Sequence, residues 1–275
     1  MRAKIAHISD VHFERLDRDV SDRLAGALRL VSPNLLIFTG DLVDNFWKIK
    51  QAKEWLLQLC TGCQLDPERQ LVVIPGNHDY RLYGNFGFRP ATGHCFRKHF
   101  AEWNRNRVIL YREYGICIIR VDSNPIIFGF ARGVVSQWQL RRIRAELEAL
   151  RDEDRRFVAA ATKIALVHHH PLPVPHEGQD TFLMLEKAQN LIQFLAEQRV
   201  DCILHGHKHR APHSLLSLGT CISSDRVVQV IGAGTAVAGG TDRESRGHNF
   251  NVITVEDTGL LFAQQYFAQP GEDFR

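Results

Sequence analysis

The sequence predicts an α/β fold, and three observations support this. Short apolar runs end in polar or glycine residues, amphipathic segments lie between them, and polar clusters directly follow several of the runs. The early apolar runs are typical of buried strands: 4–8, 35–38, 71–74, 116–121, 163–167 and 202–204. Later segments carry β-branched or aromatic residues separated by turn residues: 227–231, 250–255 and 260–267.

Helical patterns alternate with the early strands: 20–30, 46–59, 95–104, 136–151 and 182–198. Ser136, followed three residues later by Gln139, forms a capping box at the start of the fourth of these helices. Strands that alternate with helices predict a largely parallel sheet, whose ligands bind beyond the carboxyl ends of its strands.

The composition is that of a globular protein. The chain has 275 residues, 44% hydrophobic and 24% charged, and we expect a single domain over 1–275. The net charge of +3 is too small to favour nucleic acid as a partner. The most basic stretch, 141–156, interleaves Arg with Glu and Asp, which is typical of a solvated helix face.

The sequence predicts a cytoplasmic protein that does not enter the membrane. No apolar run approaches the ~18 residues that a membrane span needs, and the first residues do not resemble a signal peptide. The six cysteines are scattered, which suits free thiols in a reducing compartment. Cys60 and Cys63 have CxxC spacing, but no second pair accompanies them to complete a zinc site.

Polar clusters follow five of the expected strands: Asp10-Val11-His12, Gly40-Asp41-Leu42-Val43-Asp44, Gly76-Asn77-His78-Asp79, His168-His169-His170-Pro171 and Gly206-His207-Lys208-His209. Each cluster alone could be structural, since helix caps and hydrogen-bonded core residues use the same side chains. Together they supply carboxylate, imidazole and amide donors, a mixture that suits Mn, Fe or Zn.

In this order the clusters resemble the motifs of the calcineurin-like metallophosphoesterases: DxH, GDxxD, GNHD, an HHP-type histidine and GHxH. The resemblance spans residues 10 to 209. It implies a four-layer α/β/β/α sandwich, which agrees with the extra strands expected after residue 225.

The resemblance also implies two metal ions, Mn, Fe or Zn, with Asp41 bridging them. One ion would be held by Asp10, His12, Asp41 and His209, and the other by Asp41, Asn77, His169 and His207. Among the three consecutive histidines we expect His169 to be the ligand, because the family's ligand is separated from the proline by one residue. Strand alternation then sends His168 and His170 to the opposite side, with His168 in the core or in a supporting position.

The implied reaction is phosphoester hydrolysis by a hydroxide held between the two cations. His78 would lie near the leaving oxygen as a general acid or electrostatic stabiliser. Asp79 would orient His78 or make an ordinary structural hydrogen bond, and His205 would support the metal ligands.

One group of residues indicates the class of substrate. Val121-Asp122-Ser123, Gly133 and Gln137-Trp138-Gln139-Leu140 partly resemble the branch of the family that acts on cyclic nucleotides and glycerophosphodiesters. We therefore expect a small phosphodiester as the substrate. A nuclease, a pyrophosphatase acting on a nucleotide or lipid diphosphate, and a non-catalytic scaffold remain as alternatives.

The segment 80–106 mixes aromatic residues, arginines and glycines directly after the GNHD motif. It is either a cap over the site, where such side chains hold a base or a phosphate, or a packed surface loop with a short helix. The sequence does not identify substrate-binding residues or the oligomeric state.

Overall fold

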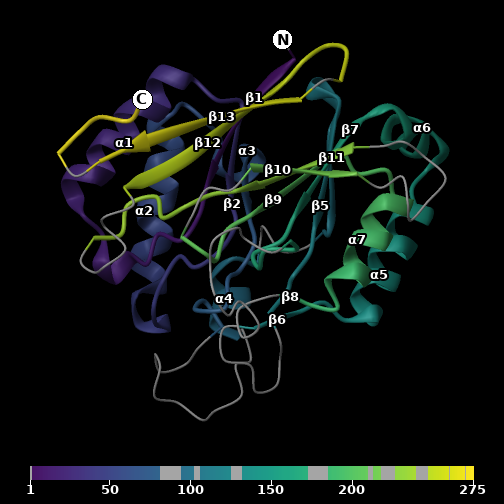
Figure 1. Cartoon of the computed structure of the whole chain (residues 1–275), viewed down its shortest axis with the longest axis horizontal. Helices are drawn as coiled ribbons and strands as arrows, with labels where there is room; N and C mark the ends of the chain where they lie inside the picture. The colour runs from purple at the N-terminus through teal and green to yellow at the C-terminus, as the bar shows by residue number, and fades with distance from the viewer. Residues whose placement is uncertain are drawn as a thin grey trace.

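Two β-sheets pack face to face in the computed structural model of the protein, and helices cover the outer faces of both (Figure 1). The structure describes residues 2–80, 94–101, 106–124, 132–172, 185–209, 213–217, 227–239, 247–259, 261–269 and 271–275. Most of the segment expected as a cap over the site, and parts of the loops that follow the strands ending at residues 120, 166 and 205, lie outside these residues.

The first sheet has the strand order β13-β12-β1-β2-β3. Its strands are β1 (Ala3–Ile8), β2 (Leu35–Phe38), β3 (Leu71–Val73), β12 (His248–Val255) and β13 (Leu261–Ala268). The first three are parallel, whereas β12 and β13 are antiparallel additions at one side.

The second sheet has the order β10-β11-β9-β7-β5-β4. Its strands are β4 (Val108–Tyr111), β5 (Ile116–Arg120), β7 (Thr162–Leu166), β9 (Cys202–His205), β10 (His213–Ser217) and β11 (Val227–Gly232). The four central strands are parallel, and the two edge strands are antiparallel. A separate parallel pair joins β6 (Gly133–Val134) to β8 (Leu185–Glu186).

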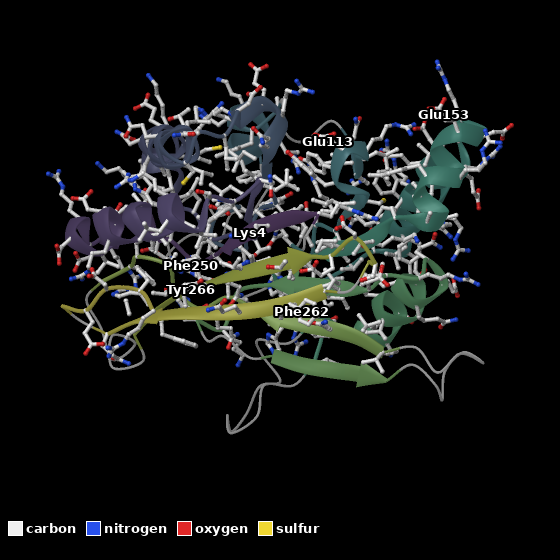
Figure 2. All side chains as sticks on the ribbon, turned by 90° about the horizontal axis from the view of Figure 1, so that it is seen from above. Lys4, Glu113, Glu153, Phe250, Phe262 and Tyr266 are labelled. Atoms are coloured by element: carbon white, nitrogen blue, oxygen red, sulfur yellow. The ribbon has the colours of Figure 1, made fainter. Side chains whose placement is uncertain are left out.

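Helices α1 (Arg18–Val31) and α2 (Ile49–Gly62) cover the first sheet, and α5 (Gln137–Glu148) and α7 (Ala188–Glu197) cover the second (Figure 1). The remaining α-helices are α3 (Pro67–Gln70), α4 (His94–His99) and α6 (Asp152–Ala160). Ser136 caps α5 by accepting a hydrogen bond from Gln139 N, as the sequence predicts. The expected helix 136–151 instead ends at Glu148, and α6 follows as a separate helix whose Glu153 points away from the body of the protein (Figure 2).

Side-chain alternation along the strands divides the core into three clusters. In β1, Ile5 faces the space between the sheets, whereas Ile8 faces the helices. In β7, Leu166 lies between the sheets, and Ala165 packs on the helix side. On the rim of the first sheet, the stacked rings of Phe250 and Tyr266 join β12 to β13, with centroids 4.8 Å apart (Figure 2).

The layers therefore follow the order α/β/β/α, which confirms the architecture that the resemblance implies. The expectation of one largely parallel sheet is corrected to two mixed sheets, in which the expected early strands form the parallel centres. The single-domain assignment of 1–275 stays a prediction.

The four cysteines whose side chains are described, Cys60, Cys63, Cys117 and Cys202, are free thiols. Among the described helices, none combines the length and apolarity that crossing a bilayer requires.

Candidate metal centre

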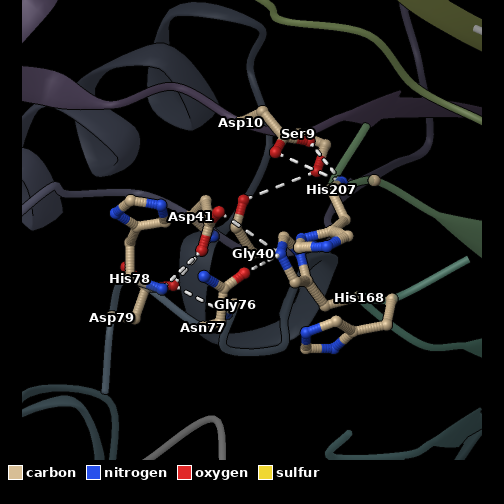
Figure 3. Close-up of polar contacts among 12 residues, drawn as sticks. Ser9, Asp10, Gly40, Asp41, Gly76, Asn77, His78, Asp79, His168 and His207 are labelled. Carbon is tan, nitrogen blue, oxygen red and sulfur yellow. Dashed lines mark hydrogen bonds and ion pairs between the residues drawn. The ribbon is translucent and has the colours of Figure 1, made fainter. Parts of the chain in front are cut away.

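The carboxyl ends of the parallel strands in both sheets bring the polar clusters to one place. The loop after β1 carries Asp10 and His12, and the loop after β2 carries Asp41. The second sheet contributes the histidines that follow β7 and β9. Asp10, Asp41, Asn77, His168 and His207 therefore gather between the sheet ends, although they come from five different strands (Figure 3).

Five of the expected ligands have a left-handed backbone conformation, which is rare for residues other than glycine: Asp10 (φ 52°), His12 (44°), Asp41 (57°), His207 (79°) and His209 (52°). Each such residue costs on the order of 1–3 kcal/mol, and such residues cluster at functional sites. This concentration at one point of the fold indicates a functional site.

Glycines allow the loops to approach closely. A Cβ at Gly206 would overlap Ser9 Oγ, and one at Gly76 would overlap the Asp41 carboxylate. The glycines of the GNHD and GHxH motifs thus leave room for the carboxylates that lie beside them.

Among the described residues, three groups of acidic and imidazole side chains could hold a metal ion. One of them is His12, Asp44 and His78, and the other two contain most of the expected ligands. Asp10, His12 and His209 present ligand atoms within 4.8 Å of one another, and so do Asp41, His168 and His207. The two clusters adjoin at Asp41, whose Oδ2 lies 4.0 Å from His12 Nε2 and 3.3 Å from His168 Nε2. Asn77 belongs to the second cluster, because its Oδ1 lies 3.1 Å from His168 Nε2.

Hydrogen bonds to Nδ1 orient two of the imidazole rings. His12 Nδ1 lies 2.8 Å from Asp44 Oδ1, and His168 Nδ1 donates to the carbonyl oxygen of Thr39 at 2.7 Å. Each bond places a proton on Nδ1 and leaves Nε2 directed at the cluster, which is how metal-binding histidines are commonly held.

The ring nitrogens that face the clusters fit a cation. His12 Nε2 and His207 Nε2 are buried and have no hydrogen-bond partner among the described residues. Buried nitrogens are normally satisfied, and an ion in each cluster would accept the lone pair of the nitrogen that faces it. The oxygen and imidazole donors also suit a first-row transition metal.

The charges of the two clusters are strongly coupled. Burial raises the pKa of Asp41, but His168 and His78 outweigh it and hold that pKa well below its usual value. Burial lowers the pKa of His168, but Asp41 outweighs it and raises that pKa to about 9. Burial, followed by the nearby charge of His168, keeps the pKa of His207 well below its usual value. His207 is thus a neutral imidazole, the form that binds metals.

His169 lies in a different position from the one expected for it. Its Nδ1 is 2.7 Å from Ser123 Oγ, and a Cβ at Gly133 would overlap its ring. His168 lies beside Asp41 and Asn77 instead. The reason is the alternation of side chains along β7. His168 falls on the same side as Ile164 and Leu166, which face the first sheet, whereas His169 falls on the helix side.

The expected catalytic pair is also rearranged. The carboxylate near the His78 ring is Asp44, whose Oδ1 lies 3.4 Å from His78 Nδ1. Asp79 accepts hydrogen bonds from four backbone N–H groups, those of Asp41, Leu42, Val43 and Gly76. Its role in the structure is therefore to tie the loop after β2 to the loop after β3, in agreement with the structural alternative.

His205 is buried, as a supporting residue would be, with Nδ1 3.2 Å from the Gly206 carbonyl oxygen. Burial lowers its pKa to about 4. The sequence does not predict that Asp44 and Thr235 lie at the site. The GDxxD motif contains Asp44, but Thr235 carries no local sequence signal.

Comparisons with known proteins concern the family and the fold. The profile of the calcineurin-like phosphoesterase family matches residues 3–211. A probable cyclic nucleotide phosphodiesterase from Rhodococcus erythropolis is 30% identical over 254 residues, covering 83% of this chain and 74% of that protein. A probable glycerophosphodiester phosphodiesterase from Arcobacter nitrofigilis is 27% identical over 190 residues, covering 66% of this chain and 59% of that protein. The match therefore spans less than two thirds of the Arcobacter protein.

Among solved structures, a dimetal phosphatase from Danio rerio superposes with a TM-score of 0.53 at 14% identity, covering 93% of each chain. At that identity the likeness concerns the fold alone.

Proposed function

Because this chain belongs to the calcineurin-like phosphoesterase family, whose members use a dimetal centre to hydrolyse phosphoric esters, we propose that its substrate is a small phosphodiester. The substrate class is that of cyclic nucleotides or glycerophosphodiesters. The observation that carries the proposal is the pair of adjoining carboxylate and imidazole clusters at the strand ends. The names of the relatives from Rhodococcus and Arcobacter support the choice of a diester.

The proposed metal sites follow the two clusters. Asp10, His12, Asp41 and His209 hold one ion. Asp41, Asn77, His168 and His207 hold the other. This set replaces His169 by His168, because His168 Nε2 lies within 3.3 Å of both Asp41 Oδ2 and Asn77 Oδ1.

When bound, the two ions supply Lewis-acid stabilisation of the phosphoryl oxygens and an activated nucleophile. His78 is the residue of this chain suited to the leaving group. Its side chain is 21% exposed, so a substrate can reach it. Asp44 faces Nδ1 and leaves Nε2 to donate a proton to the departing alkoxide oxygen. The backbone N–H of His78 donates to Asp41 Oδ1 at 2.8 Å, which fixes the distance between the proton donor and the metal cluster.

We also propose that the protein works in a reducing compartment such as the cytoplasm. The buried free thiols of Cys60, Cys63, Cys117 and Cys202 support this.

The substrate proposal is tested with purified protein loaded with Mn²⁺. Turnover is measured side by side on bis-p-nitrophenyl phosphate, p-nitrophenyl phosphate, cyclic AMP, glycerophosphoethanolamine and single-stranded DNA. We expect the small diesters to be hydrolysed faster than the monoester and the DNA. A preference for the monoester, or for DNA, would overturn the proposal.

His78→Ala tests the proton donor separately. We expect turnover to fall by a factor of about 10²–10⁴, the usual contribution of general acid catalysis, while the metal content stays at the wild-type value. The loss should be smaller for bis-p-nitrophenyl phosphate, whose nitrophenolate leaves without protonation, than for glycerophosphoethanolamine. Equal losses on both substrates would contradict the assigned role.

A further inference from the structure

Thr235 connects the two sheets at the first metal cluster. It lies in the loop between β11 and β12, beyond residues 3–211 that match the family, and it is buried. Its Oγ1 lies 2.8 Å from His209 Nδ1 and 3.0 Å from the carbonyl oxygen of Asp10. One hydroxyl thus touches two of the proposed ligand residues of the same ion.

The hydroxyl has a single proton to share between these neighbours. The carbonyl oxygen of Asp10 can only accept a hydrogen bond, so the Thr235 proton is directed to it. The remaining contact is then satisfied only if His209 Nδ1 carries a proton and donates to Thr235 Oγ1. In a neutral imidazole that leaves the lone pair on Nε2, which lies 3.8 Å from Asp10 Oδ1 on the side of the metal cluster.

Asn249 on β12 holds the threonine in place. Its Oδ1 accepts from Gly234 N at 2.9 Å, and its backbone N donates to the Thr235 carbonyl oxygen at 3.0 Å. Its Nδ2 donates to the Tyr266 carbonyl oxygen at 3.1 Å. The position of the hydroxyl is therefore fixed by β12 and β13.

We propose that Thr235 is a positioning residue that sets the tautomer of His209 and so prepares Nε2 as a metal ligand. The inference rests on the proposed metal site and adds to it a residue from outside the part of the chain that matches the family. Thr235 acts in the same way as Asp44 does for His12 and the Thr39 carbonyl for His168.

The tautomer is measurable without any metal or substrate. In the ¹⁵N-labelled metal-free protein, two-bond ¹H–¹⁵N correlations at about pH 8, above the ordinary pKa of histidine, report which ring nitrogen carries the proton. The signals of His209 are identified by their loss in His209→Gln. We expect the proton on Nδ1, and a proton on Nε2 would overturn the proposal.

Variants then test the consequence for metal binding. Thr235→Val keeps the shape of the side chain but removes the hydroxyl. We expect Mn²⁺ to bind 10–100-fold more weakly, about the loss that follows removal of a hydrogen-bond partner of a metal ligand. Thr235→Ser restores the hydroxyl and should bind Mn²⁺ within about 3-fold of wild type.

Thr162→Val is the matched control, since Thr162 is a buried threonine at the opposite end of β7. It should leave Mn²⁺ affinity unchanged. Wild-type affinity in Thr235→Val, or weak binding in Thr235→Ser, would overturn the role of Thr235. A wild-type protein that binds no Mn²⁺ would instead overturn the proposed metal centre, so the two failures are distinguishable.

Discussion

At the scale of single residues, His168 and His169 are neighbours at the end of β7 but lie in different surroundings. His168 contacts the Thr39 carbonyl oxygen, Asn77 and Asp41, all from the first sheet. His169 contacts Ser123 of the second sheet. The side of the strand on which a histidine falls decides whether it faces the proposed metal centre or supports it from behind.

Replacing His168 or His169 by glutamine separates these two roles. We expect His168→Gln to lower the bound Mn²⁺ and to reduce diester turnover more than about 100-fold, beyond the loss usual for an outer partner of a ligand. His169→Gln should retain its metal, because its contact with Ser123 can be replaced by an amide. The measurement is metal content by elemental analysis alongside turnover. If His169→Gln lost its metal and His168→Gln retained it, His169 would be the ligand, as its spacing from Pro171 predicts.

The sequence predicts most of the residues that the structure brings together here, because their types and spacing are those of metal ligands at strand ends. The choice between His168 and His169 depends on which side of β7 each side chain falls. Three histidines in a row do not show this from the sequence. The position of Asp79 in the GNHD motif predicts a place beside His78. It lies elsewhere because three backbone N–H groups of the loop after β2 and the N–H of Gly76 in the loop after β3 all donate to its carboxylate. Thr235 depends on the packing of β12 against the site, which no local pattern encodes.

At the scale of elements, helix α5 is joined to the loop that supports His169. Gln139 on its buried side donates to the Asp122 carbonyl oxygen at 2.7 Å and accepts from Asp122 N at 2.8 Å. The same loop reaches the GNHD segment, since Asn124 Nδ2 donates to the Pro75 carbonyl oxygen at 3.0 Å. Residues 121–123 and 137–140, which carry the partial resemblance, therefore hold each other in place through these hydrogen bonds.

Gln139→Ala should therefore destabilise the protein and impair the site together. Removing the amide leaves the backbone groups of Asp122 without partners, which costs about 1–3 kcal/mol when they stay buried. The matched control is Gln137→Ala in the exposed first turn of the same helix, expected within about 0.5 kcal/mol of wild type. Urea unfolding and diester turnover are measured for both variants. Equal stability of the two would show that the Gln139 contacts are not needed to hold this loop.

Strands β4, β6, β8 and β10 are not predicted from the sequence. Strands β6 and β8 have two residues each, too few for a pattern to be recognised. The break between α5 and α6 was also missed, because charged residues continue through it at helical spacing. The central strands are predicted because burial on both faces makes them continuous apolar runs, and the amphipathic helices are predicted because burial on one face gives them a helical period.

At the scale of the whole molecule, the proposed metal centre lies between the two sheets. Asp10, His12, Asp41 and Asn77 follow strands of the first sheet, whereas His168, His207 and His209 follow strands of the second. Without cations, Asp10 and Asp41 are buried carboxylates at this junction, and burial raises the pKa of Asp10 to about 6. Bound ions would neutralise these charges and join the two sheets at their ends.

Metal binding should consequently stabilise the fold as a whole. An ion that binds only the folded state at about 100 times its dissociation constant contributes ~2.7 kcal/mol, which corresponds to a rise in Tm of roughly 5–10 °C for a chain of this size. We expect chelator-treated protein to unfold at the lower temperature and Mn²⁺ to restore the higher one. Asp41→Asn is the control, since it keeps the shape of the bridging side chain but removes its charge, and its Tm should respond weakly to Mn²⁺. An identical Tm with and without Mn²⁺ in the wild-type protein would mean that the cations do not join the sheets.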